Sequence, residues 1–311
     1  MKVYHNINDL PAFSNAVITI GTFDGVHNGH LQIISQLIKE AESINGTPVL
    51  ITFFPHPKQV VSSKKEALFL INTPEEKYSL LKQHGILHIV EVPFNKAFAE
   101  QTATQYIEDF LVKIFHPHTI IIGYDHRFGN NREGDYQLLE KEAIRFGFKV
   151  KEIPEHVLAN VTISSTRIRS ALLQGDINTA ADLLGYPYFF SGLVVQGNQL
   201  GRTIGYPTAN LQMNDANKLV PANGVYAIRV NIEGNKTTFK GMMNIGIRPT
   251  VEGGNRLIEV NIFDFNDMIY GNTIQVTLLK LLRQEIKFAS LDDLKAQLAL
   301  DKAEASALHN I

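Results

Sequence analysis

Residues 21–30, GTFDGVHNGH, decide the fold of the first half of this chain. An apolar run at 16–20 ends at Gly21, and a pattern typical of a helix begins near His30. A strand that leads through glycines into a helix N-terminus forms an anion site, because unpaired backbone N–H groups and the helix dipole favour negative charge there. His27 and His30 are three residues apart, so we expect both to face one side and to reach one phosphate group.

Short apolar runs alternate with longer segments of helical periodicity up to about Gly185. The runs at 16–20, 48–54, 86–92 and 119–123 are typical of buried parallel strands, and the segments 31–42, 74–84 and 103–115 are typical of helices. This alternation predicts a doubly wound, Rossmann-like parallel sheet. Ser164 or Ser165 is a natural N-cap for one further helix that continues to Leu173.

The pattern changes after Tyr186 and Pro187 to short alternating runs separated by Gly, Asn and Pro. The runs 188–195, 224–230, 239–244, 257–263 and 273–279 predict an antiparallel barrel or sandwich. The final segment, 291–309, repeats Leu291, Leu294 and Leu298 on one face and predicts a helix that packs on this sheet. We therefore expect two domains, residues 1–185 and residues 186–311.

Composition narrows the classes of partner. The 311 residues carry a net charge of −2 and 44% hydrophobic residues, so we expect no nucleic-acid or membrane partner. The partners we expect are small-molecule substrates, and we also expect weak self-association. No apolar run approaches the length of a spanning helix and the N-terminus lacks a signal-peptide core, which predicts a cytoplasmic protein. The absence of cysteine excludes disulfides, thiolate metal sites and cysteine nucleophiles.

Four polar segments of the first domain are expected at the carboxyl ends of its strands, where open α/β sheets bind ligands. In the last of these segments, ISSTRIR at 163–169, the serine and threonine hydroxyls, the free N–H groups of a helix start and the Arg169 guanidinium suit a triphosphate. His56, between two prolines, is either a site residue or part of a turn, while His116 and His118 resemble a metal pair but lack a carboxylate companion and predict a solvated loop. The four segments are GTFDGVHNGH at 21–30, TFFPHP at 52–57, GYDHRFG at 123–129 and ISSTRIR at 163–169.

The second domain opens with GNQLGRTIGYPTAN at 197–210, whose glycines allow a ligand to approach the backbone closely. After the rigid Pro207, Thr208 and Asn210 present neutral oxygens two residues apart, which suits Mg²⁺ that is held partly by substrate phosphates. Glu259 follows in LIEVNIFDF, where an isolated glutamate in an alternating strand is more often a solvent-facing residue than a catalytic one.

The HxGH turn is typical of nucleotidyltransferases, and the four segments resemble, in order and spacing, the FMN adenylyltransferase module of bacterial bifunctional riboflavin kinase/FAD synthetases. Two positions depart from that pattern: Asn28 replaces a leucine, and His126 replaces an aromatic residue in the predicted flavin loop. The resemblance implies ATP contacts at Gly21, Phe23, Asp24, Gly25, His27, His30, Ser164, Ser165 and Arg169, and flavin contacts at His56, Asp125 and Phe128.

The second domain resembles the riboflavin kinase module through GRxxGxPTAN, NIGxRPT, ExxIFDF and LRxExxF. This resemblance implies that Thr208 and Asn210 hold magnesium and that Glu259 is the general base, while Arg283 holds flavin or closes the site. The further implied ATP or flavin contacts are Gly197, Gly201, Arg202, Gly205, Pro207 and Asn244. The two resemblances span nearly the whole chain and imply that riboflavin is converted to FMN and then to FAD, with ATP and Mg²⁺ at both steps.

The two implied reactions need different residues. Phosphorylation of riboflavin needs a base, because an alcohol loses its proton as it attacks phosphorus. The phosphate of FMN is already ionised, so adenylylation needs N–H donors and positive charge, and we expect His27 and His30 to stabilise phosphate rather than to act as bases. Three alternative functions remain. A nicotinate- or pantetheine-type adenylyltransferase would leave the second domain unexplained, and an aminoacyl-tRNA synthetase would need a KMSKS loop, which this sequence lacks. A flavin carrier would need neither a catalytic base nor an ATP-binding motif.

Overall fold

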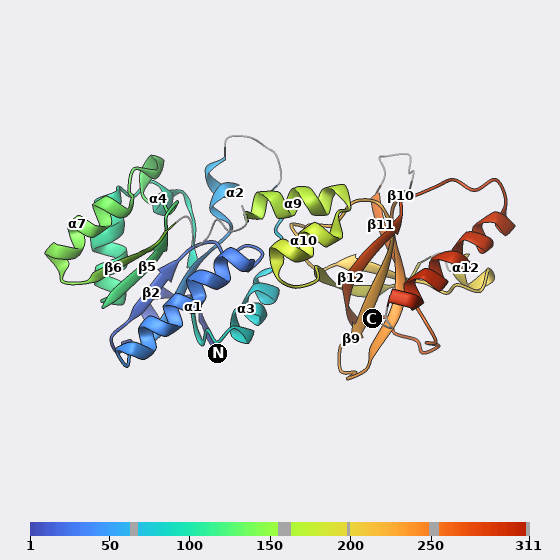
Figure 1. Cartoon of the computed structure of the whole chain (residues 1–311), viewed down its shortest axis with the longest axis horizontal. Helices are drawn as coiled ribbons and strands as arrows, with labels where there is room; N and C mark the ends of the chain where they lie inside the picture. The colour runs from blue at the N-terminus through green and yellow to red at the C-terminus, as the bar shows by residue number, and fades with distance from the viewer. Residues whose placement is uncertain (63–67, 155–162, 198–199, 249–254, 309–311) are drawn as a thin grey trace. The chain divides into compact units, whose positions relative to one another are not determined.

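The computed structural model describes residues 1–62, 68–154, 163–197, 200–248 and 255–308 (Figure 1). The chain forms two compact units, Met1–Ser165 and Thr166–Ile311. The domain boundary expected after residue 185 stays a prediction.

The first unit is built on a six-stranded parallel sheet with the order β1-β4-β3-β2-β5-β6. From β2 the chain moves outward through β3 and β4 and then returns to β5 on the other side of β2. The doubly wound fold is thereby confirmed, and the strand order reverses at β2, the strand that precedes the GTFDGVHNGH turn. The strands are β1 Lys2–Tyr4, β2 Val17–Ile20, β3 Pro48–Phe54, β4 His88–Pro93, β5 Thr119–Gly123 and β6 Lys149–Ile153.

Helices cover both faces of this sheet (Figure 1). Helix α1 packs against β2 and β5, and aromatic residues of the segment 103–115 join the core under β2 and β3. That segment is helical as predicted, but its middle is a π-helix. The helices are η1 Ile7–Asp9, α1 Asn28–Ser43, α2 Pro57–Val61, α3 Pro74–Gln83, α4 Lys96–Ala99, α5 Ala103–Gln105, η2 Tyr106–Val112, α6 Lys113–Phe115, η3 Asn130–Arg132 and α7 Tyr136–Phe146.

The second unit is a closed antiparallel barrel with the order β10-β11-β8-β7-β12-β9, which resolves the choice between barrel and sandwich. All five expected strands are present, and β8, which the sequence pattern missed, completes the barrel. The strands are β7 Phe189–Val195, β8 Ala209–Met213, β9 Gly224–Ile232, β10 Thr238–Arg248, β11 Asn255–Ile262 and β12 Thr273–Arg283.

The helices that the described part of the chain adds after β6 are α9 Ser165–Gln174, α10 Ile177–Leu184, α11 Leu200–Thr203 and α12 Leu291–Leu308. Helix α12 packs on the outside of the barrel through Ala305, with Leu298 and Leu308 beside it. The expectation that Leu291 lies on the packing face is wrong, because Leu291 is 57% exposed in the first turn of the helix. The buried residues of α12 are instead Ala305 and Asp301, and the charge of Asp301 is paired with Arg283.

Candidate active sites

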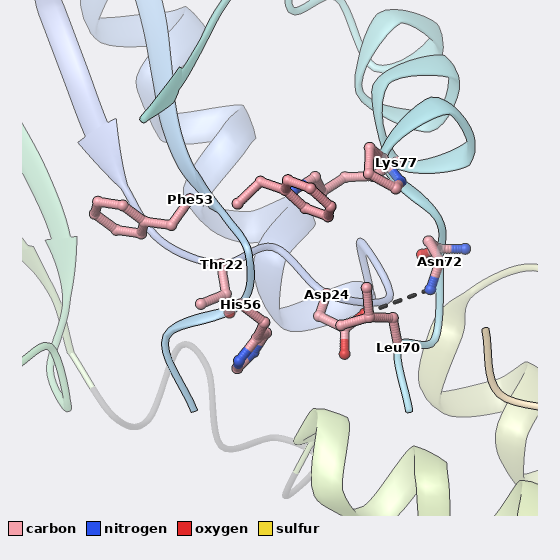
Figure 2. A pocket seen from close by; sticks show the side chains of 9 residues that line it. Thr22, Asp24, Phe53, His56, Leu70, Asn72 and Lys77 are labelled. Carbon is pink, nitrogen blue, oxygen red and sulfur yellow. Dashed lines mark hydrogen bonds between the residues drawn. The ribbon is translucent and has the colours of Figure 1, made fainter. Parts of the chain in front are cut away.

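The turn after β2 is held in an unusual backbone conformation. Phe23, Gly25 and Val26 have φ values of 48°, 94° and 36°, a region that a β-branched residue such as Val26 rarely adopts. Such strain persists only where the surroundings impose it, and it is common at ligand sites. The side chain of Asp24 is one restraint, because it is buried and its Oδ1 accepts a hydrogen bond from the backbone N–H of Ile71 at 2.9 Å. The same oxygen accepts a second hydrogen bond from the backbone N–H of Asn72 at 3.4 Å (Figure 2).

The two histidines of the turn form one stacked pair. His27 is the N-cap of α1, and its Nδ1 accepts the backbone N–H of His30 at 3.3 Å. The ring centroids are 3.6 Å apart with the planes 12° from parallel. Gly29 permits this arrangement, since a Cβ at that position would lie 3.3 Å from the His27 ring. The prediction that both histidines face one side is therefore confirmed, although the helix begins at Asn28, earlier than expected.

Burial keeps both imidazoles neutral at pH 7. It lowers the pKa of His27 to about 4, and it lowers the pKa of His30 well below the usual range, with the neighbouring His27 and Lys77 adding to that effect. The Nδ1 atoms of both rings face protein: that of His27 accepts a hydrogen bond, and that of His30 is buried without a hydrogen-bond partner among the described residues. Because its Nδ1 is an acceptor, the neutral ring of His27 carries its proton on Nε2, which is left as a donor to a ligand.

Helix α9 begins at the second serine of ISSTRIR. The Ser165 hydroxyl donates to the backbone carbonyl of Asp24 at 2.9 Å, so this serine is attached to the turn after β2. Ser164 is exposed one residue before the helix. Arg169 lies one turn further into α9, within the second compact unit, and its part in ATP binding stays a prediction.

A small pocket lies beside the turn, at the carboxyl end of β3 (Figure 2). Its volume of about 20 Å³ is enough for a water molecule and too small for a substrate. His56 lines it and also caps α2, because its Nδ1 accepts the backbone N–H of Lys58 at 3.1 Å. Sequence reasoning missed Lys77, whose buried ammonium also reaches this pocket. The lining residues are Thr22, Asp24, Phe53, Phe54, His56, Leu70, Asn72, Pro74 and Lys77.

The two expected flavin contacts of the GYDHRFG segment, Asp125 and Phe128, lie in different environments. Asp125 is exposed directly after β5. Phe128 is 6% exposed and stacks on Tyr106 in the core, with ring centroids 5.1 Å apart. His126, which departs from the family pattern, lies with its ring 5.8 Å from that of Phe128. Of these residues, Asp125 has the side chain that is open to a ligand.

Strand register brings three expected kinase residues together in the barrel. Glu259 of β11 is directly opposite Asn210 of β8 and directly opposite Asn244 of β10. Residues directly opposite in antiparallel strands project from the same face. The flanking residues of β11, Ile258 and Val260, are buried in the barrel core, so this row of polar residues lies on the outer face of the sheet. Glu259 is half-buried on this face, and the choice between a solvent-facing and a catalytic role for it stays a prediction.

The glycine-rich segment before β8 lies close to this row. A Cβ on Gly197 would lie 1.8 Å from Nδ2 of Asn210, and a Cβ on Gly201 would lie 3.3 Å from Oγ1 of Thr208. The backbone carbonyl of Pro207 accepts a hydrogen bond from Asn261 Nδ2 at 2.6 Å, which attaches the segment to β11. Arg202 and Gly205 are exposed.

Arg283 forms an ion pair with the buried carboxylate of Asp301. Its Nε is 3.1 Å and 3.0 Å from the two carboxylate oxygens of Asp301, and its Nη2 is 2.8 Å from the second of them. Asp301 is 3% exposed and also accepts a hydrogen bond from Gln297. Arg283 thus ties β12 to α12, and a direct contact with flavin stays a prediction.

No group of three or more His, Cys, Asp or Glu side chains in the described ranges is arranged to hold a metal ion. Among the helices in the described part of the chain, none is long and apolar enough to cross a membrane.

Comparison with known proteins assigns both halves. The family model for FAD synthetase matches residues 10–167, and the family model for riboflavin kinase matches residues 184–309. A bifunctional riboflavin kinase/FMN adenylyltransferase of Haemophilus influenzae is 39% identical over 306 residues, which cover 98% of this chain and 97% of the relative. A protein of the same name from Escherichia coli is 40% identical over 301 residues, which cover 97% of this chain and 95% of the relative.

A solved structure is similar over the same length. A crystal structure described as a macrolide-efflux protein from Streptococcus pneumoniae superposes with a TM-score of 0.88 at 34% identity, covering 98% of each chain.

Proposed function

The chain belongs to the family of bifunctional riboflavin kinases/FMN adenylyltransferases, and we propose from this how its residues divide the two activities. The chain phosphorylates riboflavin with ATP to give FMN, and it adenylylates FMN with a second ATP to give FAD and pyrophosphate. The observation that carries the residue assignment is the row Asn210–Glu259–Asn244 across three barrel strands.

In the proposed kinase site Glu259 accepts the proton of the riboflavin hydroxyl while that oxygen attacks the γ-phosphorus of ATP. The new O–P bond forms as the bond from the γ-phosphorus to the β-phosphate oxygen breaks, and ADP leaves. Asn210 and Asn244, one on each side, hold the carboxylate and the hydroxyl in line.

Thr208 and Asn210 fit a magnesium ion by their chemistry and surroundings. Both offer uncharged hard oxygens, and they are faced by Gly201 and Gly197, where any Cβ would crowd them. Bound Mg²⁺ would offset the charge of the β- and γ-phosphates. Magnesium, a cytoplasmic location and weak self-association stay predictions from the sequence.

In the proposed adenylylation site, an ionised phosphate oxygen of FMN attacks the α-phosphorus of ATP, and pyrophosphate leaves. No proton has to be removed, which suits a site whose two histidines are neutral donors rather than bases. The Nε2–H groups of His27 and His30 stabilise the charge that develops on the phosphate oxygens. Ser164, Ser165 and Arg169 complete this site in the proposal.

The test separates the two steps in one chain. Wild type is incubated with riboflavin, ATP and Mg²⁺, and chromatography follows FMN and FAD. Glu259→Ala is expected to abolish FMN formation and to spare FAD formation from supplied FMN, whereas His30→Ala is expected to do the reverse. His116→Ala, at an exposed histidine, is the matched control and should leave both steps unchanged. If either active-site variant stopped both steps while remaining folded, the two-site assignment would be wrong.

A further inference from the structure

Lys77 is a buried lysine that the mechanism above does not use. It lies on α3, whose start is fixed by a capping box between Thr73 and Glu76. The residue is only 7% exposed, and its side chain points from α3 toward β3 and the turn (Figure 2). A buried ammonium is costly unless it is paired and hydrogen-bonded, so its contacts require an explanation.

A chain of hydrogen bonds connects Lys77 to the phosphate-binding turn. Its Nζ donates to Oγ1 of Thr52 at 3.0 Å, and that hydroxyl donates to the backbone carbonyl of Thr22 at 3.2 Å. Thr52 is fully buried. Because the ammonium occupies an acceptor position of the hydroxyl, it directs the single hydroxyl proton toward Thr22.

The same segment holds the turn at a second point. Two residues of the loop before α3, Ile71 and Asn72, donate their backbone N–H groups to the Asp24 carboxylate. The segment 70–77 therefore restrains the turn through Asp24 on one side and through Thr22 on the other. Between these contacts lies Phe23, in the left-handed region, a conformation that needs such external restraint.

The charge of the Lys77 ammonium is consistent with a position beside the histidine pair. Burial lowers the pKa of Lys77 to about 8, while the carboxylates of Glu91 and Asp24 act to raise it, so Lys77 is predominantly a cation at pH 7. Its charge in turn helps to keep His30 neutral. Helix α3 thus places a positive charge behind the histidine pair.

We propose that Lys77 is a positioning residue for adenylyl transfer, which acts through Thr52 to hold the Thr22 carbonyl and with it the turn that presents His27 and His30. The inference rests on the proposed function of the first unit. Because a small displacement of catalytic groups affects the transition state more than ground-state binding, the loss is expected in kcat rather than in KM for ATP.

The test is a double-mutant cycle on the full chain, with supplied FMN and ATP as substrates. Lys77→Met and Thr52→Val are each expected to lower the kcat of FMN adenylylation about tenfold or more, with KM for ATP within about threefold of wild type. The double variant is expected to be no slower than the slower single variant, because both remove one chain of contacts. Lys77→Arg, which keeps a cationic donor, should recover part of the rate.

Two controls separate positioning from loss of fold. Lys82→Met removes an exposed lysine from the same helix and should leave kcat unchanged. Riboflavin phosphorylation by the same preparations reports the barrel unit, and circular dichroism reports the fold of the whole chain. If Lys77→Met does not fold, the kcat of FMN adenylylation by the nearly isosteric Thr52→Val variant tests the proposal on its own.

Each outcome has a defined meaning. If wild type makes no FAD from supplied FMN, the proposed function fails. If wild type is active and either folded single variant matches it, the inference is overturned. If both single variants are slow but their losses multiply in the double variant, Lys77 and Thr52 act independently and the proposed chain of contacts is also overturned.

Discussion

Acid is expected to destabilise the first unit through His27. Its pKa is lowered from 6.5 to about 4 by burial in the folded chain, so between these values the unfolded chain binds more protons than the folded one. The stability that follows from this shift is fully present above pH 6.5 and is lost as the pH falls toward 4. From pH 8 to pH 5, proton linkage for a shift from 6.5 to about 4 gives a loss of about 2 kcal/mol in the free energy of unfolding.

The variant His27→Asn isolates this contribution. Asparagine keeps an N-cap acceptor for the backbone N–H of His30 but cannot titrate in this range. Hydrogen exchange with mass spectrometry, measured on peptides of β2 and α1 over a series of urea concentrations, gives the free energy of unfolding of the first unit separately from that of the barrel. Wild type should lose about 2 kcal/mol more than the variant between pH 8 and pH 5.

A matched control is His116→Asn, which changes an exposed histidine in a left-handed conformation that asparagine accepts. This control should follow wild type at every pH. Equal losses in wild type and His27→Asn would refute the reasoning, since the burial of His27 would then carry no penalty for its protonated form.

Two further changes test the barrel unit. Asp301→Asn should lower its free energy of unfolding by about 2 kcal/mol in urea titrations, because Arg283 loses a charged hydrogen-bond partner that is buried; an unchanged midpoint would contradict this. Gly197→Ala should slow riboflavin phosphorylation about tenfold or more and spare FMN adenylylation, because its Cβ would overlap Asn210 Nδ2. Gly234→Ala is the control: its Cβ enters open space at the β9–β10 turn, but the residue has a φ of 79°, so this variant reports the cost of a strained glycine substitution away from Asn210. Equal losses of phosphorylation in both glycine variants would contradict a specific effect.

The central strands could be predicted because burial on both faces leaves a continuous apolar run, as in β5, where the prediction and the structure have the same bounds. The edge strands β1 and β6 could not. Their sequences, KVY and KVKEI, carry lysines, because an edge strand is only partly covered by its neighbours. The strand β8 was missed for another reason: it is short and directly follows a segment rich in glycine and proline.

The residues of the candidate sites also differ in how far the sequence alone predicts them. The His27–His30 pair is local, so spacing in the sequence was enough to predict it. Glu259 and Asn210 are distant in the chain, and without the resemblance only the strand register could bring them together. Lys77 gave no signal, because a lysine in a helix that reads PEEKYSLL is expected on a solvated face. Only its burial in the folded chain distinguishes it from Lys82.

The register of the three proposed kinase residues also has a consequence for the order in which the two units form. Asn210, Glu259 and Asn244 meet through pairing of whole strands, and β12 must pair with β7 and β9 before the barrel that holds them is closed. A growing chain therefore carries all three residues before it can phosphorylate riboflavin. The parallel sheet is complete at β6, much earlier in synthesis. The half of the chain that consumes FMN is thus made before the half that produces it, the reverse of the order in which the two reactions occur.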